Sequence, residues 1–148
     1  MEIHQDYDIR EIKIEDVDYL YLLCKQLGYP VPQEDIMANV KSIIDKSDYI
    51  IYGAVLPEGK VIGCIQAHIN RMFYSDIMIE VNGLIIDEKY RSQGIGEKLL
   101  RRVESFGKEK RCRYVNLRAN VIRKSAHKFY EKLGYQNIKQ QINYRKEI

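Results

Sequence analysis

Apolar residues recur along the chain with two spacings, one typical of helices and one typical of strands. Apolar positions three or four residues apart predict amphipathic helices, whereas short β-branched and aromatic runs predict strands. The predicted helices are 17–27, 36–44, 95–106 and 126–133, and the predicted strands are 49–56, 61–69, 77–86, 114–119 and a last segment ending near Tyr144. A hairpin followed by the order β-loop-α-β-α-β predicts an α/β fold, a mixed sheet with helices on its faces.

Length and charge narrow the class of protein. The chain has 148 residues, which predicts a single domain over residues 1–148 with one substantial core. The net charge of +3 suits an anionic ligand, and the basic residues form no nucleic-acid motif, so we expect no nucleic-acid partner. No apolar run approaches the roughly 18 residues of a membrane span, and the acidic N-terminus lacks a signal-peptide pattern. We therefore expect a cytoplasmic protein with no membrane partner.

Cysteine and histidine are too scattered to predict a metal site. The three residues of each type have no partner at metal-ligand spacing. They are Cys24, Cys64, Cys112, His4, His68 and His127. We expect reduced thiols, no bound metal and no Cys–His nucleophile pair.

A glycine-containing loop joins the predicted strand 77–86 to the predicted helix 95–106. Its sequence, Arg91-Ser-Gln-Gly-Ile-Gly96, allows a tight turn in which backbone N–H groups and the positive end of the helix dipole converge on one anion. A pyrophosphate suits such a cradle, and a strand-to-helix turn without a ligand is the alternative. Gly83, inside the strand, predicts a bulge or a group that approaches the backbone closely.

These segments together resemble the GNAT superfamily of acyl-CoA-dependent N-acyltransferases. Residues 91–96 match the family's pyrophosphate motif Arg/Gln-x-x-Gly-x-Gly/Ala, and residues 81–87 look like its bulged fourth strand. Downstream, residues 117–120 and the stretch Ser-Ala-His-Lys-Phe-Tyr-Glu-Lys-Leu-Gly-Tyr at 125–135 are similar to the fifth strand and the following helix. The motifs cover nearly the whole chain, and some stretches look like the bacterial aminoglycoside acetyltransferase branch.

The resemblance implies a mostly antiparallel sheet that is splayed between its fourth and fifth strands, with helices on both faces. Acetyl-CoA is then the cosubstrate, with its pantetheine arm in the gap and its pyrophosphate on the glycine loop. The residues that the resemblance assigns to acetyl-CoA are Leu84, Ile85, Ile86, Arg91, Ser92, Gln93, Gly94, Ile95, Gly96, Asn120 and Ser125. Many relatives have Asn at the position of Ser125.

Attack of an amine on a thioester needs a neutral amine, a polarised carbonyl and a protonated leaving thiolate. The resemblance assigns the thiolate proton to Tyr130, which as an alternative is a core aromatic, and the carbonyl to a backbone N–H near Leu84. Strand periodicity puts Glu80, Asn82, Leu84 and Ile86 on one face if no bulge intervenes. Glu80 is therefore the candidate base, acting through a water. A solvated strand glutamate is the alternative. Asn82 could position the water or the substrate, and His68 could serve as the base instead.

The sequence therefore predicts an N-acetyltransferase that transfers the acetyl group of acetyl-CoA to a primary amine of a small molecule. The amine attacks directly in a ternary complex. A peptide or protein amine is an alternative acceptor, and a CoA-binding regulatory module without transfer is a second alternative. Because the C-terminal strand of relatives often joins a dimer, we also expect a homodimer.

Overall fold

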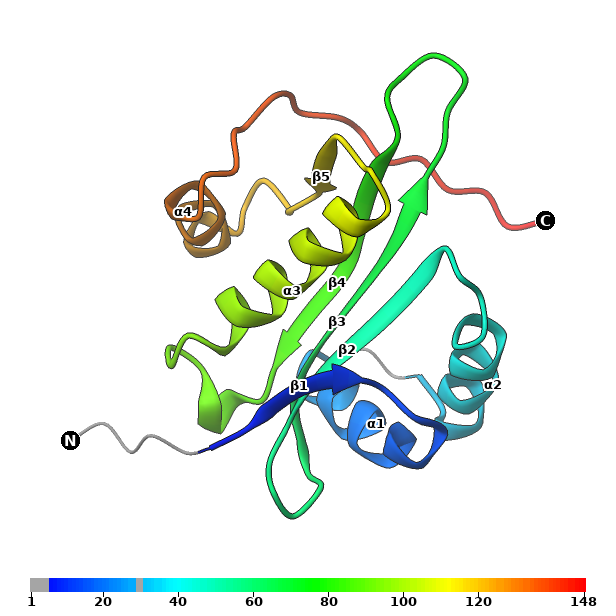
Figure 1. Ribbon diagram of the computed structural model, residues 1–148, viewed down its shortest axis with the longest axis vertical. Helices are drawn as coiled ribbons and strands as arrows, with labels where there is room; N and C mark the ends of the chain where they lie inside the picture. The colour runs from blue at the N-terminus through cyan, green and yellow to red at the C-terminus, as the bar shows by residue number, and fades with distance from the viewer. Residues whose placement is uncertain (1–5, 29–30) are drawn as a thin grey trace. The chain divides into compact units, whose positions relative to one another are not determined.

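The computed structural model describes residues 6–28 and 31–148, which contain both strands and helices (Figure 1). By their contacts the residues fall into two compact units, Met1–Leu117 and Arg118–Ile148. The elements are β1 (Asp8–Glu11), α1 (Val17–Gln26), α2 (Gln33–Ile43), β2 (Tyr49–Val55), β3 (Val61–Asn70), β4 (Met78–Ile86), α3 (Ile95–Glu109), β5 (Tyr114–Leu117) and α4 (Lys124–Lys132), with short 3-10 helices η1 (Ile14–Asp16) and η2 (Glu88–Tyr90). The four predicted helices and all predicted strands except the last are confirmed.

The sheet of the first unit has the order β1-β2-β3-β4-β5. Neighbouring strands are antiparallel except β4 and β5, which are parallel. The β4–β5 ladder ends at the pair Val81–Leu117. Within the described chain, residues 83–86 of β4 therefore have ladder partners on β3 alone. The predicted mostly antiparallel sheet, splayed between the fourth and fifth strands, is confirmed.

A bulge interrupts β4 at Asn82. Gln66 pairs with Gly83 and the next residue, Ala67, pairs with Val81, so Asn82 is the extra residue. The predicted bulge is confirmed, so the condition under which Glu80, Asn82, Leu84 and Ile86 would share one face, a strand without a bulge, does not hold.

The two ends of β4 show how the bulge changes the facing of the side chains. A Cβ on Gly107 of α3 would lie 3.4 Å from Ile79, and one on Gly63 would contact both Ile86 and Ile95 of α3. Ile79 and Ile86 therefore both face α3, although they are seven positions apart and strict alternation would put them on opposite faces. Glu80 consequently faces away from α3, whereas Ile86 faces toward it.

Helices cover both faces of the sheet, as predicted (Figure 1). On one face α1 and α2 pack against β2 and β3; the buried residues of this cluster are Ile12, Val17, Leu20, Leu23, Ile36, Val40, Ile51, Val55 and Val61. Tyr52, between Ile51 and Gly53 on β2, points to the other face, where its ring lies 4.9 Å from the guanidinium of Arg102 on α3. The apolar stripe of α3 packs against this face of the sheet and forms a second core. Its Leu99, Leu100 and Val103 are fully buried.

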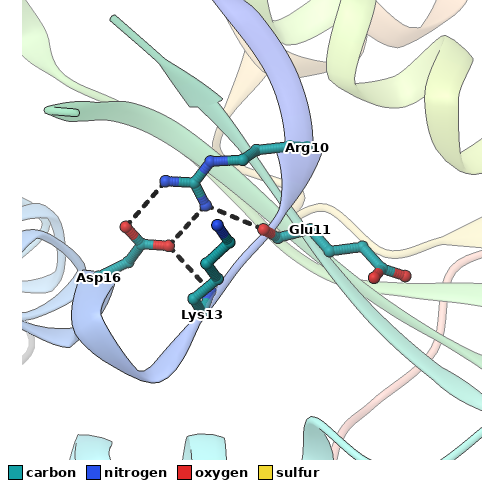
Figure 2. A network of polar contacts seen from close by, with 4 residues as sticks. All are labelled: Arg10, Glu11, Lys13 and Asp16. Atoms are coloured by element: carbon teal, nitrogen blue, oxygen red, sulfur yellow. Dashed lines mark hydrogen bonds and ion pairs between the residues drawn. The ribbon is translucent and has the colours of Figure 1, made fainter. Parts of the chain in front are cut away.

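An ion pair joins the edge strand β1 to the start of α1 (Figure 2). Arg10 donates to both carboxylate oxygens of Asp16, at 2.7 and 3.1 Å, and the amide of Lys13 donates to Asp16 at 2.8 Å. Burial of Asp16 opposes its ionisation, but the hydrogen bonds from Arg10 and Lys13 outweigh burial, so the pKa of Asp16 lies below its ordinary value. The pair fixes how the chain passes from the sheet into the helical layer.

The sequence pattern fails at the two ends of the sheet. Strand β1 is not predicted, because its four residues, Asp-Ile-Arg-Glu, carry no alternating apolar signal. The prediction of a last strand ending near Tyr144 is wrong, since residues 135–148 contain no helix or strand. Ile138, Ile142 and Tyr144 are the apolar residues that suggested it, and all three are exposed and join no ladder with another described strand.

Candidate active site

The candidate anion cradle, residues 91–96, lies between β4 and α3. Asp87 fixes its start, because the Asp87 amide donates to the Ile62 carbonyl at 2.9 Å and the carboxylate caps η2 with a backbone hydrogen bond of 3.0 Å. Arg91 turns back, and its Nε donates to the Ile86 carbonyl at 3.1 Å. The guanidinium therefore ties the cradle to the end of β4.

The backbone of the cradle has the conformation of an anion-binding loop. Ser92 and Gly94 have positive φ angles, 63° and 83°, and each follows a residue with a negative φ. Such alternation turns successive N–H groups toward one point. The N–H groups of the first turn of α3 also have no acceptor within the helix. Because residues 91–94 are exposed, a pyrophosphate can reach these donors, so the residues fit the predicted ligand.

A row of polar side chains crosses the opposite end of the sheet, on the face turned away from α3. Tyr49 of β2 pairs in register with His68 of β3, His68 with Glu80 of β4, and Glu80 with Asn116 of β5. In register, paired side chains of neighbouring strands lie on the same face. We call Tyr49, His68, Asn82, Glu80 and Asn116 the polar row.

Glu80 is held in place within the polar row. The Asn116 amide nitrogen donates to Glu80 Oε2 at 2.6 Å, and only 8% of Glu80 is exposed. The alternative of a solvated strand glutamate therefore does not hold. A carboxylate that is buried and hydrogen-bonded keeps a fixed orientation, as proton transfer requires.

Asn82 and His68 form a second pair in the polar row. Asn82 is exposed at the bulge, and its Oδ1 lies 3.0 Å from His68 Nδ1. The His68 ring also stacks on Tyr49, with centroids 5.3 Å apart. Asn82 thus orients a histidine, a contact that the sequence does not predict.

Gly83, next to the bulge, is not required by crowding inside the protein. A Cβ at this position would meet no described atom within 4 Å, and its φ is not in the left-handed region. Open space beside an exposed strand backbone is consistent with the predicted close approach of another group.

The second unit contains the remaining candidates. Burial raises the pKa of the Tyr130 phenol, an effect that the charge of Arg123 partly opposes. A raised pKa keeps the phenol protonated, as a proton donor requires. The Tyr130 ring contacts those of Phe129 and Tyr135, with centroids 5.2 and 6.1 Å apart.

Asn120 and Ser125 flank the start of α4. The Ile122 amide donates to Asn120 Oδ1 at 3.1 Å, and the Asn120 carbonyl lies 2.8 Å from His127 Nε2. Ser125 is exposed in the first turn of α4. These contacts fix the loop before the helix and leave the roles of both residues as predictions.

Residues 14–135 match the sequence profile of the Acetyltransferase (GNAT) family. The chain belongs to this family. It is therefore an acetyl-CoA-dependent N-acetyltransferase, as the motifs predicted, with acetyl-CoA as its cosubstrate. In this GNAT chain the cradle is the expected site of the CoA pyrophosphate.

Several characterised GNAT proteins are similar to this chain. Aminoalkylphosphonate N-acetyltransferase of Salmonella typhimurium is 28% identical over 134 residues, 86% of this chain and 84% of the relative. Aminoglycoside N(6')-acetyltransferase type 1 of the same organism is 24% identical over 143 residues, 94% of this chain and 98% of the relative. A solved aminoglycoside N-acetyltransferase in complex with CoA has a TM-score of 0.86 at 22% identity, and the alignment covers 100% of this chain and 99% of that one. The last similarity establishes the GNAT fold.

Two further observations concern metals and membranes. Among the described residues, no group of three or more His, Cys, Asp or Glu side chains could hold a metal ion. Within residues 6–28 and 31–148, no helix has the length and apolar character to cross a membrane.

Sequence reasoning missed Asn116 and Tyr49. Asn116 is a polar residue inside the predicted strand 114–119, and that interruption is the signal that could have drawn attention to it. Its partnership with Glu80 depends on the parallel register of β4 and β5, which no local pattern encodes.

Proposed function

We propose that this GNAT enzyme acetylates a primary amine of a small molecule by direct attack in a ternary complex. The observation that carries the proposal is the Glu80–Asn116 pair. The Glu80 carboxylate is buried, is oriented by Asn116 and lies next to Val81, the last residue before the β4 bulge. The two relatives named above, by their names, act on aminoalkylphosphonates and aminoglycosides, both small amines.

The cosubstrate would bind along β4 and the cradle. The N–H groups of residues 91–96 bind the pyrophosphate, and the backbone of residues 84–86, beyond the end of the β5 ladder, hydrogen-bonds to the pantetheine arm. A backbone N–H near Leu84 polarises the thioester carbonyl, which accumulates negative charge as the amine attacks.

Two side chains would move protons. Glu80 accepts a proton from the acceptor amine through a water, and Asn82 positions that water or the substrate. Tyr130, the residue that the family resemblance assigns to this role, donates a proton to the departing CoA sulfur. The amine nitrogen forms the new bond to the carbonyl carbon, and the carbon–sulfur bond breaks with its electron pair on sulfur.

A thiol-release assay tests the proposal. The purified chain is incubated with acetyl-CoA and, separately, with an aminoalkylphosphonate, an aminoglycoside, a polyamine and a lysine-containing peptide. We expect release of CoA thiol above the blank with at least one of the small amines. Release with the peptide alone would favour a protein acceptor, and CoA binding without release from any amine would favour a regulatory module.

We also propose that the enzyme is a cytoplasmic homodimer. The exposed Ile138, Ile142 and Tyr144 offer apolar surface that a second copy would bury. The three cysteines are free thiols, as is usual in a reducing compartment. Sedimentation velocity should detect a dimer, and a monomer at all concentrations would contradict this part of the proposal.

A further inference from the structure

His68 is a titratable side chain of the polar row that two neighbouring residues hold in place. Tyr49 stacks on one side of its ring, and Asn82 Oδ1 contacts its Nδ1 at 3.0 Å. The register of β3 and β4 places His68 directly opposite Glu80. A histidine held from two neighbouring strands beside a candidate base is in a position to take part in the same proton transfer.

The contact with Asn82 selects the tautomer of the imidazole. An amide oxygen only accepts hydrogen bonds, so the contact with Asn82 Oδ1 is a hydrogen bond in the tautomer that carries its hydrogen on His68 Nδ1. In the neutral ring, Nε2 then carries the lone pair and is the basic atom. His68 is half-buried and Asn82 is exposed, so this pair lies near the surface of the protein.

The chemistry of the reaction leaves a need for such a group. A carboxylate is a weak base toward an alkylammonium ion, whereas an imidazole changes its protonation state between pH 5 and 8. Glu80 is buried and already accepts a hydrogen bond from Asn116. An ammonium attracted by the Glu80 carboxylate can lose its proton near neutral pH more readily to an imidazole than to that carboxylate.

We propose that His68 Nε2 is the terminal proton acceptor for the amine, with Asn82 and Tyr49 as its positioning residues. The proposal rests on the proposed function and adds a step to it. The ammonium gives one proton, through a water, to Glu80, which passes it to Nε2 as an added step, and the imidazolium releases that proton to solvent. The neutral amine then attacks the thioester. Tyr130 gives its proton to the sulfur, and the second proton of the amine replaces the proton that Tyr130 lost.

The surroundings of His68 bear on its protonation. The titratable groups that face it from the flanking strands are Tyr49 on β2 and Glu80 on β4. The ion pair between Arg71 and Asp48 lies farther along, at the end of these strands. A charge change at Asn82 should therefore act on His68 directly, through the existing contact.

Kinetics of two variants test the proposal. His68→Gln removes the titrating atom, and we expect kcat/KM for the amine near pH 6.5 to fall about 100-fold, with the deficit shrinking as the amine deprotonates at high pH. Asn82→Asp keeps an acceptor for Nδ1–H but adds a negative charge, so the low-pH limb of kcat/KM should move to higher pH. The exposed Glu58→Gln, in the β2–β3 turn, is the control and should leave the profile unchanged. If the profiles of kcat/KM against pH for His68→Gln and Asn82→Asp both superimposed on that of the wild type, the proposal would be overturned.

A measurement that does not require turnover separates this proposal from the proposed function. Nitrogen chemical shifts of the His68 ring, assigned by comparison with His68→Gln, report the neutral tautomer in the folded wild-type chain. We expect hydrogen on Nδ1, and hydrogen on Nε2 would overturn the assignment even if the enzyme acetylates amines. Absence of thiol release with every amine, at an Nδ1–H tautomer, would instead contradict the proposed function.

Discussion

Glu80 differs from a surface carboxylate because it is buried and Asn116 donates to one of its oxygens. Glu80→Gln preserves the shape of the side chain but removes the proton acceptor. We expect turnover to fall by about 10- to 100-fold, most strongly at low pH, where the neutral amine is scarce. A pH–rate profile that overlies that of the wild type would show that Glu80 is a bystander.

Tyr130 is the residue for which a catalytic and a structural role predict different results. As the acid for the CoA sulfur, Tyr130→Phe should lower kcat about 100-fold, because a thiolate can also leave partly without help. As a packed aromatic, loss of the hydroxyl should change the free energy of unfolding by about 1 kcal/mol and leave kcat intact. Steady-state kinetics and a thermal melt on the same variant distinguish the two roles.

The pKa of Tyr130 gives the direction of its pH dependence. Burial raises this pKa, so the protonated acid persists to higher pH than an ordinary tyrosine, whose pKa is about 10. In a profile of kcat against pH, activity that depends on the phenol should therefore decline only above that pH.

At the scale of elements, the cradle between β4 and α3 depends on the left-handed conformation of Gly94, with φ 83°. Gly94→Ala strains this backbone and places a methyl group where the phosphate approaches, so KM for acetyl-CoA should rise at least tenfold. Gly59, in the β2–β3 turn, has φ 95° and equally open surroundings, and Gly59→Ala is the matched control. Both variants should lose a similar amount of stability, about 1 kcal/mol, but only the Gly94 variant should lose affinity for CoA in calorimetry. Equal CoA affinity in the two variants would count against the cradle.

The ion pair between β1 and α1 predicts a pH-dependent stability. The pKa of Asp16 is lowered in the folded chain, so the pair stabilises the fold above pH about 4, the ordinary value for aspartate, and the stabilisation is lost as the pH falls through the lower folded value. Asp16→Asn should lower the free energy of unfolding by about 2 kcal/mol at pH 7. When the pH is lowered, the stability of this variant should fall less than that of the wild type. Asp48→Asn, which breaks the exposed pair with Arg71, should cost less than about 1 kcal/mol. Thermal melts at pH 7 and pH 3 measure both effects, and equal costs for the two variants would contradict this reading of Asp16.

Local patterns explain which elements were predictable from the sequence. The cradle, α3 and the hairpin of β2 and β3 follow from glycine placement and apolar spacing, which act within a few residues. Gly83 indicated the bulge, but the facing of Glu80 and Leu84 required the β3–β4 register. Contacts between distant segments, such as Asn116 with Glu80 or Asn82 with His68, are set by strand pairing and could not be derived from spacing along the chain.

At the scale of the whole molecule, the similarity to relatives covers most of the chain. The alignment spans 84% of the aminoalkylphosphonate enzyme and 98% of the aminoglycoside enzyme. The match to the family model, over residues 14–135, includes both the cradle and the helix of Tyr130, the segments to which the family resemblance assigns cosubstrate binding and leaving-group protonation. The polar row lies in the first unit. We expect its residues to determine which amine this enzyme accepts.

The most direct test of direct acetyl transfer to a small amine is a two-substrate initial-rate study. Acetyl-CoA is varied at several fixed concentrations of the best amine from the panel, and the acetylated amine is identified by mass spectrometry. Direct attack in a ternary complex predicts intersecting double-reciprocal lines and an acetylated amine formed in step with CoA thiol. Parallel lines with an acetylated enzyme, or thiol release without an acetylated amine, would contradict it.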